Sequence, residues 1–388
     1  MARTDRALCL DDFEAMARRH LPRPIFEYIR GGVETNASVE DNRRAFQEYA
    51  FIPRSLVDVS AIDTSVSLFG QQYRSPLGIA PMGLSALSSY RGDLVLAQAA
   101  ALAGVPMIMS GSSLIRLEEV ASIAPQAWFQ AYLPGDGQEI AKLVDRVAQA
   151  GFATLVITVD TPVAANRENN IRAGFSTPLR PSLRLLLDGL THPSWVCNTF
   201  LRTCVKHGMP HFENNYATRG APILSKNVLR DYSDRGHISW DHLRTIRKQW
   251  KGTLIIKGIL CKADAATAIE IGVDGIIVSN HGGRQLDGSI SPLRVLPEIA
   301  DTAGHIPVML DSGVRRGTDV LKALALGARC VFVGRPFAYA TAAGGQNGTD
   351  RAIHLITNEI TRDLGLLGVA RLQDLSLDCL RRIPGTFG

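Results

Sequence analysis

The amino-acid sequence predicts an α/β fold in which eight parallel strands, alternating with helices, close into a (β/α)8 barrel. Four segments share one local plan, in which a helical stretch ends at Gly and a short apolar run follows, at Gly104, Gly151, Gly272 and Gly327. Glycine accepts the left-handed conformation that often ends helices, and a continuous apolar strand suits a parallel sheet covered on both faces. Four similar runs bring the predicted strands to eight. A doubly wound open sheet is the alternative arrangement.

The predicted strands alternate with helices along most of the chain. The strands are Leu77–Met82, Pro106–Ser110, Ala127–Ala131, Thr154–Val159, Thr253–Lys257, Gly275–Ser279, Ile306–Asp311 and Cys330–Gly334. The clearest helical stretches are Asp93–Leu102, Asp136–Ala150, Lys262–Ile271, Thr318–Leu326 and Asp350–Asp363. Regular alternation of this kind favours the closed barrel over the open sheet.

Two regions lie outside this alternation. Residues Leu10–Phe51 are typical of two or three short helices, so we expect residues 1–76 to form an N-terminal helical segment packed on a barrel of residues 77–388. Between the fourth and fifth strands, Arg172–Ser239 is far longer than an ordinary connection of about 2–6 residues. We expect this stretch to be an insertion.

Composition excludes several classes of protein. The chain has 388 residues, of which 46% are hydrophobic and 20% charged, so disorder, collagen and coiled coil are excluded. The net charge of +5 is spread along the chain and does not predict nucleic-acid binding. Six scattered cysteines without a CxxC pair argue against a zinc site and a disulfide framework, so we expect no metal and a cytoplasmic location.

Neither a signal peptide nor a membrane span is predicted. Asp5, Asp11 and Asp12 stand where a signal peptide needs an apolar stretch. The longest charge-free stretch, Leu94–Ile115, is interrupted by Gly104-Val105-Pro106, which is typical of a helix followed by a strand.

The stretch Ser279–Gly288 is the richest candidate for chemistry. In a barrel, functional side chains gather at the C-terminal ends of the strands, and this stretch directly follows an apolar run. His281 and Arg284 on one Gly-bearing loop suit a general base and an anion clamp for one small substrate. The alternative is a surface loop with a solvated Arg and a capping His.

The last two strands are followed by Gly-bearing, basic loops. Such loops in barrels often hold a phosphate on backbone amides and a helix N-terminus, which points to a phosphorylated cofactor or substrate. The alternative is a pair of ordinary turns. The loops are Asp311-Ser312-Gly313-Val314-Arg315-Arg316-Gly317 and Gly334-Arg335-Pro336.

Other strands end in hydrogen-bonding side chains. Gln and Thr suit the amide edge of a heterocycle, and a Lys in apolar surroundings suits negative charge developing on it. Each of these residues taken singly could equally be an ordinary rim residue. They are Ser110, Gln130, Tyr132, Thr158, Asp160 and Lys257, with Arg167 following the fourth strand, where a salt bridge with Glu168 is its structural alternative.

These motifs resemble the family of FMN-dependent 2-hydroxy acid oxidases and dehydrogenases, which includes glycolate oxidase, flavin-type lactate dehydrogenase and mandelate dehydrogenase. The resemblance runs essentially end to end. Its most specific elements are Ser279–Gly288 and the run from Asp311 through Lys322–Ala328 to Gly334-Arg335-Pro336. The resemblance implies FMN, oxidation of an (S)-2-hydroxy acid to the 2-keto acid, and a homo-oligomer, expected to be a tetramer.

The resemblance assigns roles to individual side chains. It implies that His281 is the catalytic base, that Asp160 orients it, and that Arg284 and Arg167 clamp the substrate carboxylate. The two active-site tyrosines match Tyr28 and Tyr132, and Tyr28 is indicated by the resemblance alone. Flavin-ring positions match Pro81, Met82, Gly83, Ser110, Gln130, Thr158, Lys257 and Ser279, whereas ribityl and phosphate positions match Asp311, Gly313, Arg315, Gly334 and Arg335.

Departures from glycolate oxidase indicate substrate and electron acceptor. Gly83 stands where that enzyme has Ala, and Gly is more typical of the dehydrogenases, so we expect a quinone or another acceptor in place of oxygen. Ser112 replaces a pocket Trp and leaves room for a bulkier substrate. Leu186–Trp195 and Lys206–Pro210 resemble mandelate dehydrogenase more than glycolate oxidase, which favours an aromatic substrate over a lactate-like one.

The insertion also mixes basic and apolar residues in a pattern that can lie on the anionic inner face of a membrane. A soluble lid over the active site is the alternative. The residues are Arg180, Arg184, Arg202 and Lys206 with Leu185, Trp195 and Phe200.

Other functions remain as alternatives at this point. An oxidase that makes hydrogen peroxide keeps every motif, and other phosphate-binding barrels, such as isopentenyl diphosphate isomerase or the inosine monophosphate dehydrogenase type, keep the phosphate loops. Those barrels do not need His281 and Arg284 together with Arg167. A catalytically silent barrel is the alternative from another class, and a purified protein without yellow colour would support it.

Overall fold

The computed structural model describes residues 3–224 and 235–383, without the side chains of Arg3 and Arg184. Eight strands form one parallel sheet in the order β4-β11-β10-β9-β8-β7-β6-β5. A parallel bridge between Ile79 and Met107 joins β4 to β5 and closes the barrel, which confirms the predicted fold class. The strands are β4 Leu77–Ile79, β5 Ile108–Ser110, β6 Trp128–Ala131, β7 Thr154–Thr158, β8 Thr253–Ile259, β9 Gly275–Val278, β10 Val308–Asp311 and β11 Cys330–Val333.

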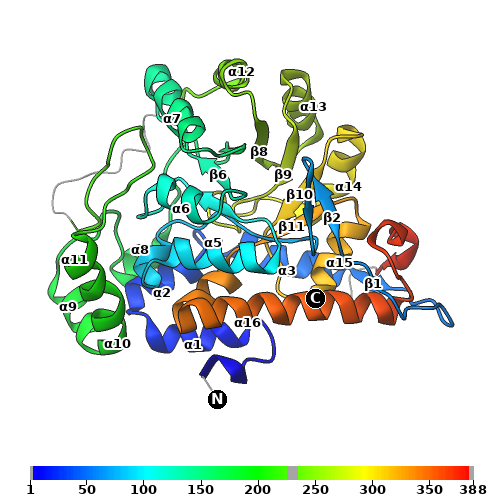
Figure 1. The fold of residues 1–388 in the computed structure, drawn as a ribbon, viewed down its shortest axis with the longest axis horizontal. Coiled ribbons are helices and arrows are strands. Elements are labelled where there is room, and N and C mark those ends of the chain that lie inside the picture. The colour runs from blue at the N-terminus through cyan, green and yellow to red at the C-terminus, as the bar shows by residue number, and fades with distance from the viewer. Residues whose placement is uncertain (1–2, 225–234, 384–388) are drawn as a thin grey trace.

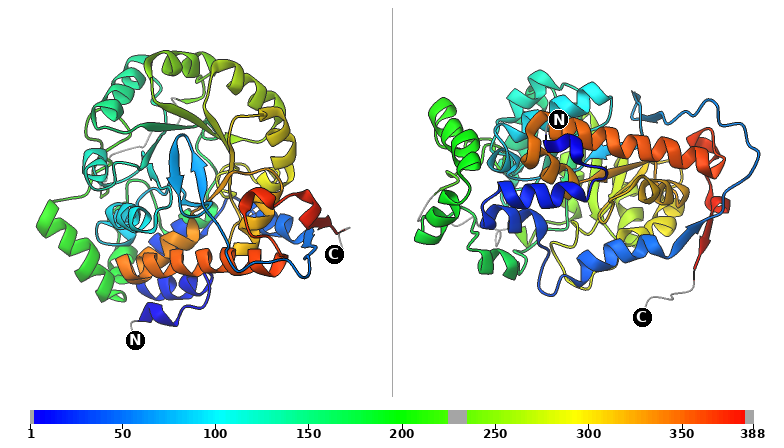
Figure 2. Two further views of the ribbon diagram at one scale, coloured as in Figure 1. Left: turned by 45° about the vertical axis from the view of Figure 1, so that its right-hand side comes forward. Right: turned by 90° about the horizontal axis from the view of Figure 1, so that it is seen from below.

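Helices surround the strands, and most of them lie in an arc around the barrel (Figure 2, left). Asp136 caps one of them, because its carboxylate accepts the N–H groups of Gln138 and Glu139 at 2.7 and 3.1 Å. The helices between the strands are α4 Ser85–Ser88, α5 Gly92–Ala103, α6 Leu117–Ile123, α7 Gly137–Gln149, α8 Glu168–Ala173, α12 Trp240–Gln249, α13 Lys262–Ile271, α14 Pro292–Ala303 and α15 Gly317–Ala325. The long α16, Arg335–Leu367, is interrupted at Gly345 by non-helical backbone.

Two apolar layers explain why the strands read as continuous hydrophobic runs. One side of each strand packs under the helices, while the other side fills the barrel interior. A hairpin of β2 Val66–Leu68 and β3 Gln71–Tyr73 packs on this interior core, lies inside the arc of helices in Figure 2, and contacts Trp128, whose indole N–H donates to the Tyr73 hydroxyl at 3.3 Å.

The N-terminal segment contains more strand than expected. Its helices are η1 Arg3–Arg6, α1 Asp12–His20, α2 Arg23–Arg30 and α3 Ala37–Gln47, and α1 packs against α16 (Figure 1). Residues Tyr49–Phe51, expected at the end of a helical stretch, instead form β1, which pairs with β12 Leu380–Arg382. This pairing is long-range and has no local signature. The short helices η4 Leu372–Asp374 and η5 Leu377–Cys379 precede β12.

The insertion follows β7 and carries a group of helices that stands at one side of the molecule (Figure 1). These are α9 Leu183–Leu190, α10 Pro193–Trp195, the π-helical η2 Val196–Leu201 and α11 Arg202–His207. Part of the expected insertion, residues 225–234, lies outside the described residues. Among the residues described, no helix combines the length and apolarity needed to cross a membrane.

The expected apolar surface of the insertion is wrong in part. Trp195 is buried, its N–H donates to the Leu87 carbonyl at 2.8 Å, and Phe200 stacks on its ring. Leu185 also packs against the core. A helical pattern in the sequence does not show which face of the helix packs on the barrel. Leu185, Trp195 and Phe200 were therefore expected at the surface, although they pack inward. The exposed leucines of α9 are instead Leu183, Leu186, Leu187 and Leu190.

Candidate active site

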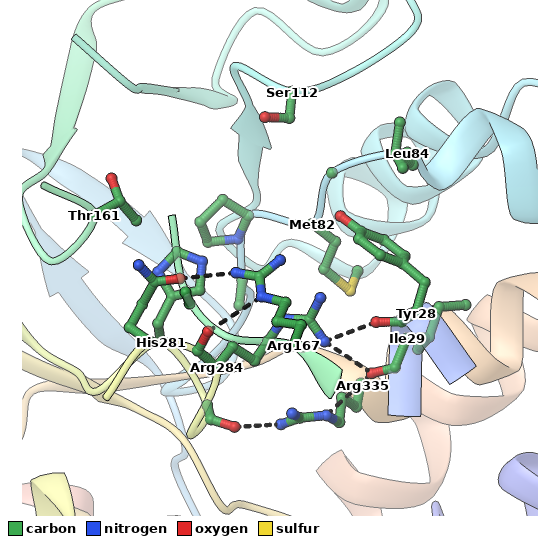
Figure 3. A pocket seen from close by; sticks show the side chains of 18 of the residues that line it. Tyr28, Ile29, Met82, Leu84, Ser112, Thr161, Arg167, His281, Arg284 and Arg335 are labelled. Carbon is green, nitrogen blue, oxygen red and sulfur yellow. Dashed lines mark hydrogen bonds between the residues drawn. The ribbon is translucent and has the colours of Figure 1, made fainter. Parts of the chain in front are cut away.

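A cavity of about 380 Å³ opens at the C-terminal ends of the strands, where the βα loops meet. Figure 3 shows the side chains of its charged centre, with His281, Arg167 and Arg284 close together and Arg335 below them. Most predicted site residues line this cavity: Tyr28, Pro81, Met82, Gly83, Tyr132, Thr158, Arg167, Lys257, His281, Arg284, Asp311, Gly313, Arg315, Gly334 and Arg335. The four others, Ser110, Gln130, Asp160 and Ser279, are not among its lining residues.

His281 and Asp160 form a hydrogen-bonded pair. The His281 Nδ1 lies 2.9 Å from Asp160 Oδ1, and Nε2 lies 3.3 Å from the Tyr132 hydroxyl. Burial lowers the pKa of His281, Asp160 raises it, and Lys257 and Arg167 lower it, so that the pKa lies below its usual value. Burial raises the pKa of Asp160, but His281 and Lys257 outweigh this and leave it lowered. The pair therefore presents a neutral imidazole oriented by a carboxylate.

The backbone conformation of the loop after β9 explains why this loop contains glycines. His281, Gly282 and Gly283 all have positive φ, at 58°, 68° and 70°. A Cβ at Gly283 would lie 2.7 Å from the backbone nitrogen of Val39, so the close approach of α3 requires glycine there. A non-Gly residue held in this conformation is typical of a functional position, and here the strain falls on His281 itself.

Lys257 is buried beside a carboxylate. Its Nζ lies 2.8 Å from Asp311 Oδ2 and donates to the Ser279 hydroxyl at 2.8 Å. Burial lowers the pKa of Lys257, but Asp311 and Asp160 raise it above its usual value. The amine is therefore a fixed positive charge. Ser279 also accepts the backbone N–H of His281 at 3.0 Å, which links the lysine to the histidine loop.

The two predicted clamp arginines, Arg167 and Arg284, lie side by side. Arg167 does not form the salt bridge with Glu168 that was the structural alternative. Arg167 donates through Nε to the Arg284 carbonyl at 3.2 Å, whereas Glu168 pairs with Arg172. Arg284 donates through Nη1 to the carbonyls of Tyr28 and Gly31 at 2.7 and 2.8 Å. Both guanidiniums line the cavity, so two cations face one small volume.

Gln285 connects these groups, and sequence reasoning gave it no role. Its Oε1 accepts from Arg167 Nη2 at 2.7 Å, and its Nε2 donates to the Asp160 carbonyl at 3.1 Å. The residue lies inside the motif Ser279–Gly288, so the motif was a signal, but a glutamine directly after an arginine does not reveal which side chains it bridges.

A second group of arginines lies at the other end of the cavity, where a phosphate was predicted. Arg335 donates to the carbonyls of Ile29, Gly31 and Gly282 at 3.1, 3.0 and 2.7 Å. Burial and then the charges of Arg284 and Arg315 lower the pKa of Arg335 to about 9. A pKa lowered by like charges marks a site short of negative charge, which a phosphate would supply.

Thr158, which lines the cavity, and Gln130, buried on the neighbouring strand β6, carry polar atoms that fit the edge of a flavin ring. Gln130 Oε1 accepts from the Ser110 hydroxyl at 3.2 Å, but Gln130 Nε2 and Thr158 Oγ1 are buried without a hydrogen-bond partner among the described residues. Buried polar atoms are nearly always paired, so these two are suited to polar atoms of a ligand. With Lys257 and the arginine end, they match the ring and phosphate of FMN.

The opposite wall carries the positions expected to govern substrate and acceptor. A Cβ at Gly83 would lie 2.9 Å from Ser112 Cβ and 3.3 Å from the Tyr28 hydroxyl. Space at Gly83 is therefore already filled by its neighbours, and an added methyl group would displace the Ser112 loop.

No group of three or more His, Cys, Asp or Glu side chains suited to a metal ion occurs in the described parts of the chain. All six cysteines are free thiols.

Fold and site together define a (β/α)8 barrel with a histidine–carboxylate pair, a buried lysine and several arginines in one cavity at the strand ends. The model of the FMN-dependent dehydrogenase family matches residues 17–382, and the chain belongs to this family. This confirms the predicted family and its cofactor, FMN. It also confirms the enzyme class, an FMN-dependent dehydrogenase of 2-hydroxy acids.

Relatives with known names cover nearly the whole chain. (S)-Mandelate dehydrogenase of Pseudomonas putida is 37% identical over 96% of this chain and 93% of its own length. L-Lactate dehydrogenase of Caulobacter vibrioides is 40% identical over 96% of this chain and 97% of its own. The crystal structure of the monotopic membrane protein (S)-mandelate dehydrogenase matches with a TM-score of 0.88 and 34% identity, over 97% of this chain and 100% of that one.

Proposed function

We propose that this enzyme oxidises an (S)-2-hydroxy acid with a bulky, aromatic side chain to the 2-keto acid and passes the electrons to a quinone. The observation that carries the reaction is the His281–Asp160 pair beside two arginines in one cavity. An anionic substrate that must lose a proton needs a base and a cationic clamp at one point. The alternative of a silent barrel does not account for this arrangement.

The protein groups divide the work. Arg284 and Arg167, assisted by the Tyr28 hydroxyl, hold the substrate carboxylate at a fixed orientation. FMN, when bound, would accept the two electrons and one of the two hydrogens that the substrate loses. His281 takes the other as a proton at Nε2, and Asp160 stabilises the imidazolium that forms.

Tyr132 and Lys257 support this step from two sides. The Tyr132 hydroxyl, 3.3 Å from His281 Nε2, lies where the substrate hydroxyl would meet the base. Lys257 places a buried positive charge beside the expected ring position, where it stabilises negative charge.

The substrate side chain is proposed from the wall at Ser112. This small buried residue lies next to Gly83, where glycolate oxidase carries larger groups at both positions. The relative named for mandelate supports an aromatic substrate, and those named for lactate support a smaller one. Turnover with an artificial dye, with chemical identification of the keto acid, distinguishes an aromatic from a small substrate. We expect a higher kcat/KM for (S)-mandelate than for (S)-lactate, and the reverse order would contradict the proposal.

The acceptor is proposed to be a quinone reached at a membrane surface. Leu183, Leu186, Leu187 and Leu190 are 54–72% exposed on α9, and a solved relative is a monotopic membrane protein. Exposed leucines on a short helix, with Arg202 and Lys206 on α11 of the same insertion, suit the interface of an anionic bilayer. None of the described residues of α9 to α11 lines the cavity, so the lid alternative has less support.

Membrane binding is tested by co-sedimentation with vesicles that contain anionic lipid. Leu186→Glu with Leu187→Glu should reduce binding strongly, because two charges replace apolar surface. Leu102→Glu is the matched control, since Leu102 is 72% exposed on α5, away from the insertion. Equal binding of all variants would contradict the membrane proposal and leave the reaction untouched.

Reoxidation separates dehydrogenase from oxidase. With a quinone as acceptor, the reduced enzyme should react slowly with dissolved oxygen and quickly with a soluble quinone. Rapid hydrogen peroxide formation in air-saturated buffer, with no gain on adding quinone, would assign the oxidase alternative. The measurement is stopped-flow reoxidation of enzyme reduced beforehand.

A further inference from the structure

Tyr28 is the one proposed substrate-binding side chain that comes from outside the barrel and its strand-end loops. It lies on α2, a helix of eight residues, and its side chain reaches the cavity edge near Met82 (Figure 3). A tyrosine on a short peripheral helix needs contacts that fix its ring. Two aromatic or cationic contacts are present: Phe175 stacks on it with ring centroids 4.5 Å apart and planes at 24°, and the Arg284 guanidinium lies 5.0 Å from its centroid.

Phe175 is itself held firmly. It follows α8 and is 5% exposed, and its backbone N–H donates to the Asn170 carbonyl at 2.8 Å. Gly174 before it has a φ of 80°, which ends the helix and turns the chain so that Phe175 lies against the cavity.

The helix that precedes Phe175, α8, is also joined to α2, the helix that carries Tyr28. Asn169 Nδ2 donates to the Glu27 carbonyl at 2.9 Å, and a Cβ at Gly31 would lie 1.5 Å from that same nitrogen. The absence of a side chain at Gly31 therefore lets α8 approach α2 closely. Phe175 and Tyr28 are fixed relative to each other through both backbone and rings.

We propose that Phe175 is a positioning residue for the reaction: its ring holds Tyr28 so that the phenolic hydroxyl faces the substrate carboxylate. The inference rests on the proposed role of Tyr28. It places the first residues of the insertion in the recognition of the carboxylate, a group common to all substrates of the enzyme. Its effect is therefore expected to be the same for small and large 2-hydroxy acids.

Another role would leave a different signature. Because Phe175 lines the cavity, direct contact of its ring with the substrate side chain is the alternative role. In that case the loss on substitution would grow with the size of that side chain. Positioning instead makes the loss depend on the Tyr28 hydroxyl.

The test is a double-mutant cycle of Phe175→Leu and Tyr28→Phe in the FMN-loaded enzyme, with (S)-lactate and (S)-mandelate as substrates and the matching keto acids as inhibitors. Stacked aromatic pairs contribute enough to raise KM and the inhibitor constants about 3- to 10-fold in Phe175→Leu, with a smaller change in kcat. In the Tyr28→Phe background, Phe175→Leu should add almost nothing. Phe175→Tyr, which keeps an aromatic face, should have a KM close to that of the wild-type enzyme, in contrast to Phe175→Leu.

Controls separate positioning from general damage. Phe152→Leu removes a ring from the buried Phe129–Phe152 pair, which lies outside the cavity, and should lower the melting temperature without changing KM. If Phe175→Leu fails to retain FMN, Phe175→Met, which keeps more of the side-chain volume, takes its place.

The outcomes are distinct. Additive effects of the two substitutions, or a loss that grows from lactate to mandelate, would overturn the positioning role while leaving the proposed function intact. An unchanged KM in Tyr28→Phe would instead remove Tyr28 from substrate binding, and with it the premise of the inference.

Discussion

The two ends of the cavity hold buried charge in different ways. At the end proposed for chemistry, the base and the lysine each have a carboxylate, His281 with Asp160 and Lys257 with Asp311, while the clamp arginines contact carbonyl oxygens. At the end proposed for phosphate, Arg335 contacts backbone carbonyls and is surrounded by further arginines. The pKa of Lys257 is raised, whereas the pKa of Arg335 falls to about 9.

The difference distinguishes charged groups that are neutralised by a partner within the protein from charged groups that need a bound anion to neutralise them. A paired charge recovers part of its desolvation cost from its partner and keeps one protonation state. A cluster of like charges remains unfavourable until an anion enters, so it favours binding of a phosphate group. Substitutions at the two ends should therefore have separable effects, on the reaction and on FMN affinity.

His281→Gln should have the largest effect on the reaction. Removal of a general base costs about 10²- to 10⁴-fold, so reduction of the flavin by substrate should fall by that factor. FMN content should remain normal, because His281 belongs to the paired end. Flavin absorbance during anaerobic mixing and the ratio of flavin to protein provide the two readouts; loss of FMN in this variant would break the division between the ends.

Asp160→Asn should give a smaller loss, about 10- to 10²-fold, because the base remains but its cation is less stabilised. The sign of the pH effect follows from the pair: Asp160 raises the pKa of His281, so its removal lowers that pKa further. The acid limb of kcat/KM should move to lower pH while the plateau falls. An acid limb that moves to higher pH would exclude this electrostatic role.

Arg335→Gln should act on the cofactor. Because a hydrogen bond to a charged group contributes strongly, the affinity for FMN should fall about 10- to 10²-fold. The affinity for riboflavin, which has no phosphate, should fall less. Arg30→Gln is the matched control, because Arg30 is 57% exposed and pairs with Glu14 and Glu27 at the surface. Flavin fluorescence titration measures both, and equal losses for FMN and riboflavin would contradict a phosphate site.

Arg284→Lys should have the smallest effect of the four. Lysine keeps the charge but loses the planar two-pronged contact, so KM should rise and the rate of flavin reduction should fall, each by about tenfold or less. Because Arg284 lies between the two ends of the cavity, the FMN content of the variant shows whether the substitution affects the cofactor as well as the substrate. Unchanged steady-state kinetics would place the carboxylate clamp elsewhere.

Residues at strand ends were the most predictable from sequence. Thr158, Lys257, Ser279 and Asp311 close apolar runs in the sequence, and parallel strands bring such positions to one edge of the barrel, although β8 continues past Lys257 to Ile259. Which of them pair was not predictable. Lys257 and Asp311 were matched to different parts of the cofactor, but they form an ion pair, because contacts across strands depend on side-chain direction inside the barrel.

Residues outside the strands were harder to predict. Tyr28 depended on the family resemblance, and Phe175 and Gln285 received no role, because each acts through a partner distant in sequence. The strand β1 was missed for the same reason, since its partner β12 lies at the other end of the chain. Local patterns predict elements and the loops between them, but they carry little information about pairings over such separations.

The central claim is that a 2-hydroxy acid reduces the FMN bound in this cavity. Anaerobic mixing of the purified yellow enzyme with a panel of 2-hydroxy acids, followed at the flavin absorption band, tests it without any acceptor. The account predicts rapid bleaching by (S)-2-hydroxy acids, fastest with an aromatic side chain, and no bleaching by their (R) enantiomers. A flavin that stays oxidised with every member of the panel would contradict it.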